Sequence, residues 1–161
     1  MAAATLIDAE LAEFLQSGIS MHLGTARAGL PQVTRAAGCR VAPDRRRVTL
    51  FVIPVQSVGV LDDIAANGAV AAVFTRPRSH RTVQLKGEDA RIGTATAQDE
   101  EFVRAQVEAF RAELAQIGFP DRLGSTLALG SPGPLLAVTF TVASAFVQTP
   151  GPGAGKALAR P

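Results

Sequence analysis

The most informative stretch of the sequence is Ser79-His80-Arg81-Thr82-Val83-Gln84-Leu85-Lys86-Gly87. Its apolar residues Val83 and Leu85 alternate with polar neighbours, which is the period of a β-strand with one buried face. Three arginines gather around its start: Arg76, Arg78 and Arg81. Because guanidinium groups donate in pairs to phosphate oxygens, this end of the strand is a candidate for phosphate recognition.

Strand patterns also occupy residues 19–25, 32–41, 47–53, 69–75 and 135–148, and the strand of the opening stretch is expected to reach residue 94 with a bend at Gly87. Apolar residues at helical spacing predict helices over 8–16, 56–66 and 97–117. Six strands joined by turns, with helices outside them, predict a mainly β protein built on a small six-stranded antiparallel barrel.

The length of 161 residues is that of a single domain, and we expect one domain over residues 1–161. The tail from about residue 149 is rich in glycine and proline and is expected to lie over the surface or a partner subunit. No apolar run approaches the roughly 20 residues that a membrane helix needs. The first residues lack a signal-peptide pattern, so the sequence predicts a cytoplasmic protein without a membrane segment.

Composition also argues against several classes of function. The net charge is only +2 and tryptophan and tyrosine are absent, which disfavours a nucleic-acid binder. The single cysteine, Cys39, excludes an internal disulfide and is interpreted as a small core residue. No cluster of metal-binding residues and no serine nucleophile motif is found, and no catalytic residue is identified. His22 is interpreted as a half-exposed strand residue.

Small residues fill the middle of the second strand: Ala36, Ala37 and Gly38. Such residues let a flat group approach the backbone closely. Arg35 and Arg40 flank them, and an odd spacing on a regular strand places two side chains on opposite faces. A β-bulge at Gly38 would bring both arginines to one face.

The order and spacing of several segments resemble the pyridoxamine 5′-phosphate oxidase-related flavin-binding split-barrel family. These segments are Gly29-Leu30-Pro31, Arg35 with Arg40, Ser57 before 61–68, the strand 69–74, and 81–87. The similarity is strongest over residues 19–94. It implies a six-stranded Greek-key split barrel that forms a homodimer, with FMN held at the subunit interface and a small-molecule substrate beside it.

The resemblance also implies which residues meet the cofactor. They are Arg35, Ala36, Arg40, Ser57, His80, Arg81 and Thr82. The oxidase itself has a Ser-Arg-Lys phosphate grip where this chain has Ser57-Val58-Gly59, and this chain has no tryptophan for the oxidase's C-terminal signature. The expected function is therefore an FMN-binding flavoprotein, an oxidoreductase whose substrate the sequence does not give. The alternatives are a flavin or haem carrier or sensor, and a deazaflavin-dependent reductase.

Overall fold

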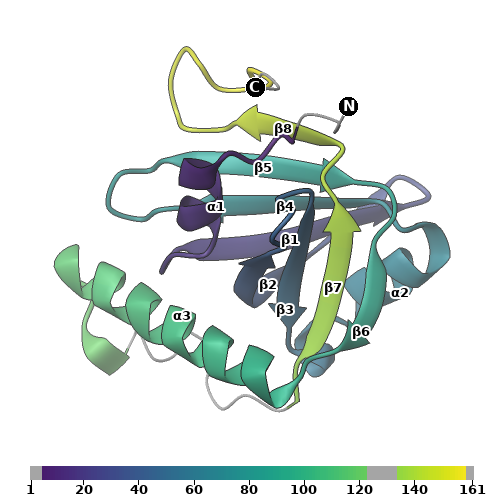
Figure 1. Ribbon diagram of the computed structural model, residues 1–161, viewed down its shortest axis with the longest axis horizontal. Coiled ribbons are helices and arrows are strands. Elements are labelled where there is room, and N and C mark those ends of the chain that lie inside the picture. Colours follow the sequence, from purple (N-terminus) through teal and green to yellow (C-terminus); the bar gives the residue numbers. More distant parts are fainter. Residues whose placement is uncertain (1–4, 123–133, 159–161) are drawn as a thin grey trace.

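The computed structural model describes residues 5–122 and 134–158 of the chain (Figure 1). The helices are α1 (Ala9–Leu15), α2 (Val58–Asn67) and α3 (Ala97–Gln116), and a 3-10 turn, η1 (Pro54–Gln56), precedes α2. The strands are β1 (Ser20–Arg27), β2 (Leu30–Val41), β3 (Arg47–Val52), β4 (Val70–Thr75), β5 (Thr82–Gly87), β6 (Arg91–Thr94), β7 (Leu136–Thr141) and β8 (Ser144–Val147). The prediction of a mainly antiparallel β protein with flanking helices is confirmed.

The sheet differs from the prediction in its strand number and in its closure. It has eight strands in the order β6-β7-β3-β2-β1-β4-β5-β8 and is not closed, so the predicted six-stranded barrel is wrong in both respects. The two extra strands arise because two predicted strands are each broken once, after Gly87 and after Thr141. At the first break a Cβ on Gly87 would lie 2.5 Å from Cδ2 of Phe140, so the glycine permits close packing where the chain changes direction.

β2 connects the two halves of the sheet. Its first half pairs with β1 and its second half with β3, and the register shifts between Ala36 and Gly38. In Figure 1, β3 and β7 run across the direction of β1, β4 and β5. The bulge that Gly38 could supply is thus present in β2. Because Ala36 and Cys39 both point into the core, Arg35 and Arg40 are brought to the side of β2 that faces away from it.

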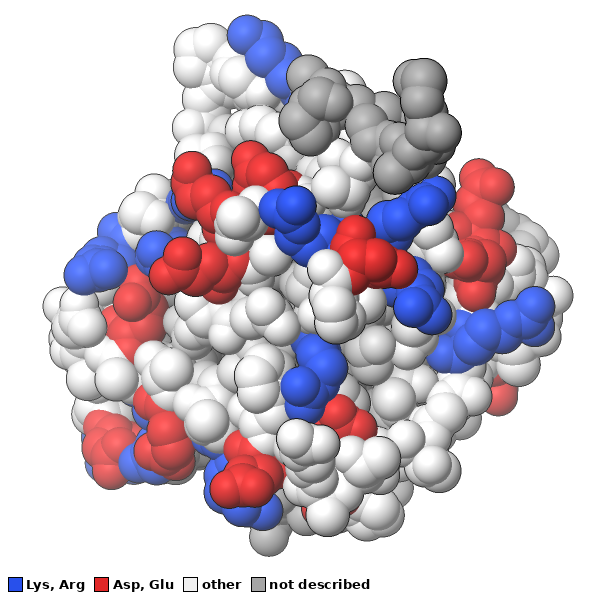
Figure 2. Space-filling model, in the orientation of Figure 1, with Lys and Arg blue, Asp and Glu red and all other residues white. Residues whose placement is uncertain are grey.

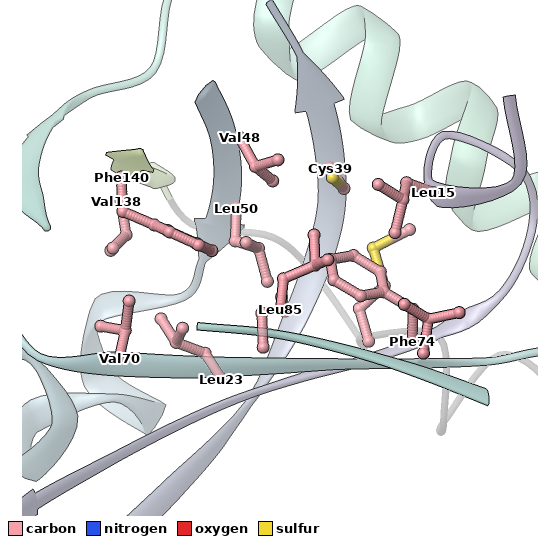
Figure 3. Close-up of a cluster of buried hydrophobic side chains, with 14 of the residues drawn as sticks. Leu15, Leu23, Cys39, Val48, Leu50, Val70, Phe74, Leu85, Val138 and Phe140 are labelled. Atoms are coloured by element: carbon pink, nitrogen blue, oxygen red, sulfur yellow. The ribbon is translucent and has the colours of Figure 1, made fainter. Parts of the chain in front are cut away.

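The main hydrophobic core lies between the two halves of the sheet, and α1 and α2 contribute side chains to it (Figure 3). Phe74, Leu85 and Phe140 are among its fully buried members. Cys39 is also fully buried here, as the sequence predicted, and burial raises the pKa of its thiol. It is therefore a packing residue, and its sulfur stays protonated.

One glutamine side chain of α3 forms hydrogen bonds with the backbone of β2. Oε1 of Gln106 accepts a hydrogen bond from the Cys39 N–H at 2.8 Å, and its Nε2 donates to the carbonyl oxygens of Cys39 and Gln16, both at 2.8 Å. Gly38 makes this contact possible, because a Cβ there would lie 2.4 Å from Gln106 Oε1. The small residue at position 38 is thus explained by α3, where the sequence had indicated a flat ligand.

The C-terminal tail folds back along β8 after residue 148. Ala157 pairs with Phe146 as an isolated bridge, and the Leu158 N–H donates to the Ala145 carbonyl at 2.8 Å. Within residues 5–122 and 134–158, no helix is both long and apolar enough to cross a bilayer.

Candidate functional site

One row of side chains crosses five strands on the side of the sheet turned away from the core. In order from β2 to β8 it consists of Arg35, His22, Val73, Gln84 and Phe146, each directly opposite the next. All five are partly buried. At about 4.8 Å between neighbouring strands, such a row spans roughly 19 Å. We call this surface, with the row described next, the outer face.

A second row runs parallel to the first and consists of Val33, Gly24, Ala71 and Lys86. A Cβ on Gly24 would have only two atoms within 4 Å, the carbonyl oxygens of Ala71 and Gln32 at 3.5 and 3.7 Å. Among the residues that the structure describes, no helix or loop side chain therefore comes within 4 Å of this position. Small and apolar residues make the centre of the outer face flat and open to a ligand.

The charge on the outer face is entirely positive. Arg35 and Lys86 are its two formal charges, and neither row contains an acidic residue. The Lys86 ammonium lies 5.2 Å from the centre of the Phe146 ring. Arg35 makes no ion pair or side-chain hydrogen bond with the part of the chain that the structure describes. On the face seen in Figure 2, by contrast, acidic and basic side chains are interspersed.

Burial lowers the pKa values of both His22 and Arg35, and a neighbouring charge adds to the effect at His22. Partial burial lowers the pKa of the His22 imidazole, and the neighbouring Arg35 charge lowers it further. Burial also lowers the pKa of Arg35, although a guanidinium stays protonated in proteins. The free protein therefore presents one positive charge and one neutral imidazole at this end of the row.

Arg40, which the sequence placed beside the cofactor, is held by α3. Its guanidinium forms an ion pair with the Asp99 carboxylate at 3.0 Å and lies 4.2 Å from the centre of the Phe102 ring. Asp99 also accepts hydrogen bonds from the Thr96 N–H and hydroxyl at the start of α3. Arg40 points away from the core, as Arg35 does, but its charge is already neutralised within the chain.

The Arg40–Asp99 contact predicts a pH dependence of stability. Burial would raise the pKa of Asp99, but hydrogen bonds from Thr96 and the Arg40 charge outweigh it and hold the pKa below its usual range. A depressed folded pKa stabilises the protein above the unfolded value of about 4 and loses that contribution as pH falls through the folded value. Urea unfolding from about pH 5 to pH 2 should show stability falling more steeply in the wild type than in Asp99→Asn. Parallel curves would contradict this assignment.

The start of β5 carries three more of the predicted residues. Arg81 forms an ion pair with Glu10 of α1 at 3.0 Å and stacks over Phe14 at 4.5 Å. His80 is exposed in the preceding turn with a φ of 57°. Thr82 is buried, and its hydroxyl donates to the His80 carbonyl at 2.9 Å.

Arg81 and Thr82 line a pocket of about 210 Å³ beside α1. Sites for ligands of cofactor size usually have volumes of about 300–1,000 Å³. This pocket by itself is therefore too small for a flavin mononucleotide.

Ala36 and Ser57 are both buried. The Ala36 methyl belongs to the main core, so only its backbone is free to meet a ligand. The Ser57 hydroxyl donates to the Ile53 carbonyl at 2.8 Å and is 2.9 Å from the Thr34 hydroxyl. Arg35 is thus the one predicted residue that lies in either row of the outer face, at the β2 end. The seven predicted residues do not meet in one site within the chain, and their role in cofactor binding stays a prediction.

The interpretation of His22 as a half-exposed strand residue is confirmed, but its position opposite Arg35 was missed, although a signal for it was present. The hairpin between β1 and β2 turns at Ala28 and Gly29, whose φ values of 51° and 79° are those of a two-residue type I′ turn. Such a turn fixes the register of the hairpin. Counting back from it places His22 opposite Arg35.

The sequence has no significant match to a protein-family model or to a curated protein. Its structure matches HupZ of Group A Streptococcus with a TM-score of 0.54 at 19% identity, covering 92% of this chain and 99% of HupZ. It also matches an F420 reductase with a TM-score of 0.52 at 18% identity, covering 85% and 97% of the two chains. For a candidate pyridoxamine 5′-phosphate oxidase of Lactobacillus delbrueckii the TM-score is 0.51 at 15% identity, with 87% and 93% covered.

The chain has the pyridoxamine 5′-phosphate oxidase-like fold. The family resemblance noted in the sequence is borne out at the level of the fold. At these identities the structural similarity establishes the fold alone. It does not establish a cofactor or an activity for this chain.

Proposed function

We propose that this protein is an FMN-binding flavoprotein that holds its cofactor on the outer face and acts as an oxidoreductase on a small molecule. One observation carries the proposal. Within the described residues, the outer face is an open surface with small and apolar residues at its centre and, at one end, an arginine, Arg35, that has no ion pair. FMN has the matching chemistry, because it joins a flat aromatic ring system to an anionic phosphate.

The residues present fit this cofactor. Gly24, Ala71 and Val73 provide the flat apolar surface against which an isoalloxazine ring can lie, and Arg35 provides the positive charge. Bound FMN supplies the hydride or electron transfer. The chain's own contribution is to bind and orient the ring and, with a covering partner, to exclude water.

A second copy of the chain is the partner that completes the site. The outer face of one chain is open, and a ligand site normally buries most of its ligand. Val33 of the second row is exposed, and so are the apolar Val55 and Val58 near the start of α2, where Gln32 of β2 meets Gly59. A dimer that covers them would remove apolar surface from water and enclose the flavin between two subunits.

The dimer predicts the effect of one surface charge. Val58→Glu should leave the fold intact, because Val58 is exposed, and should weaken dimerisation at least tenfold by burying a charge. Sedimentation equilibrium measures the dissociation constant. Ile117→Glu, at another exposed apolar position at the end of α3, is the matched control. A wild type that is monomeric, or equal effects of the two variants, would contradict the proposed interface.

The proposed cofactor is tested by titrating the protein with FMN and following flavin fluorescence. We expect saturable quenching with one FMN per chain, and reduction of the bound flavin by NADH or NADPH. A protein that purifies without colour and does not quench FMN is not a flavoprotein of this type.

The similarity to an F420 reductase favours one second candidate, a deazaflavin in place of FMN on the same face. Both ligands are flat and anionic, so the outer face fits either. Parallel titrations with FMN and coenzyme F420 decide between them, because the correct ligand should bind at least tenfold more tightly.

A further inference from the structure

We propose that His22 and Arg35 together form the anion subsite of the outer face and receive the phosphate of the bound flavin. This inference rests on the proposed function. It adds His22 as a residue that replaces the phosphate contacts of the oxidase's Ser-Arg-Lys triplet. It makes His22 a binding residue.

The geometry brings the two side chains together. His22 of β1 and Arg35 of β2 are direct cross-strand partners. Residues opposite each other on an antiparallel pair have Cβ atoms about 4.5–5.5 Å apart, so both side chains can reach one phosphate group. Both are partly buried, which strengthens a charge-assisted hydrogen bond relative to one in open water.

The other candidate arginines are already engaged. Arg40 is paired with Asp99 and Arg81 with Glu10. Arg76 donates to the Ser17 hydroxyl at 3.0 Å, and Arg78 lies 3.5 Å from a Glu113 carboxylate oxygen. A phosphate at any of these positions would have to displace an internal partner, whereas Arg35 has none to displace among the described residues.

The start of α2, where the oxidase has its phosphate-binding Ser-Arg-Lys triplet, has few groups that could bind a phosphate in this chain. Ser57 is buried and hydrogen-bonded, and Val58 and Gly59 carry no charge. The Gln32 side chain covers Gly59, since a Cβ there would lie 2.9 Å from its Oε1. The start of α2 meets the Thr34 side of β2, so the phosphate is expected on the opposite side of the strand, at Arg35.

The His22–Arg35 subsite makes the affinity for phosphate depend on pH. Across the sheet His22 faces Arg35 on β2 and apolar Val73 on β4, and the nearest other charge in the two rows is Lys86 on β5. A bound phosphate opposes the burial and the Arg35 charge that lower the His22 pKa, so it raises that pKa. Phosphate binding then takes up a proton at His22, and affinity increases as pH falls through its pKa.

Nuclear magnetic resonance of the imidazoles tests this directly, because the chain has only two histidines. Inorganic phosphate added to the wild-type protein should raise the pKa of His22, whereas the imidazole signals of exposed His80 should not respond. The response should disappear in Arg35→Gln and persist in Arg104→Gln, which removes an exposed arginine of α3. No response at His22, or an equal response at both histidines, overturns the subsite.

Flavin titrations separate the subsite from the proposed function. FMN should bind the wild type at least tenfold more tightly than riboflavin, which lacks the phosphate, and His22→Gln should remove most of that advantage. If FMN binds but its advantage over riboflavin survives in His22→Gln, the subsite is wrong and the flavoprotein proposal stands. If His22 responds to inorganic phosphate and no flavin binds, the subsite stands and the flavoprotein proposal fails.

Discussion

Replacing Gln106 with leucine is expected to lower the free energy of unfolding by about 3 kcal/mol, through the loss of three hydrogen bonds to backbone groups. Leucine has a similar volume but cannot pair with the buried N–H and carbonyl of Cys39. Burying such groups without a partner costs roughly 1–3 kcal/mol each. The same change should loosen α3, because Gln106 joins that helix to the bulge of β2. Urea unfolding at neutral pH measures the effect.

The matched control is Gln98→Leu on the exposed side of the same helix. An exposed substitution of this kind should stay within about 0.5 kcal/mol of the wild type. If both variants unfold at the same urea concentration, the Gln106 hydrogen bonds do not hold α3 on the sheet.

Replacing Gly24 with leucine is expected to abolish FMN binding, with a loss of affinity of at least a hundredfold. The new side chain has room, since its Cβ meets only carbonyl oxygens at 3.5 Å or more, so the variant should fold. Leucine also suits a strand better than glycine does. Its bulk would stand in the middle of the outer face, where the flavin ring is proposed to lie, and fluorescence titration with FMN reports the loss.

Gly93→Leu is the control for this experiment. Gly93 is also a strand glycine with open space around its Cβ position, and it lies on the edge strand β6. That variant should bind FMN like the wild type. A Gly24→Leu protein that is folded and binds FMN normally would show that the cofactor lies elsewhere.

The sequence predicted the strand and helix succession well because local patterns carry that information. It placed a bend at Gly87 but continued the strand to residue 94, and it missed the strand break after Thr141. Alternation reports which face of a strand is buried, but the position of a strand break depends on contacts with distant parts of the chain. Phe140 packing against Gly87 is a contact between distant segments, and no local pattern contains it.

The candidate site was harder to predict for the same reason. Nothing near Arg40 or Arg81 in the sequence shows that each meets a carboxylate from a distant helix, Asp99 and Glu10 respectively. Gly38 was correctly associated with a bulge and a close approach, but the approaching group is α3. The pairing of His22 with Arg35 was accessible, since it follows from the hairpin turn alone.

The most direct test of where the cofactor lies is to map FMN onto the protein by backbone amide chemical shifts. We expect the largest changes on the outer face, at His22, Gly24, Arg35 and Val73. Largest changes at Leu11, Arg81 and Thr149, which line the pocket beside α1, would contradict it.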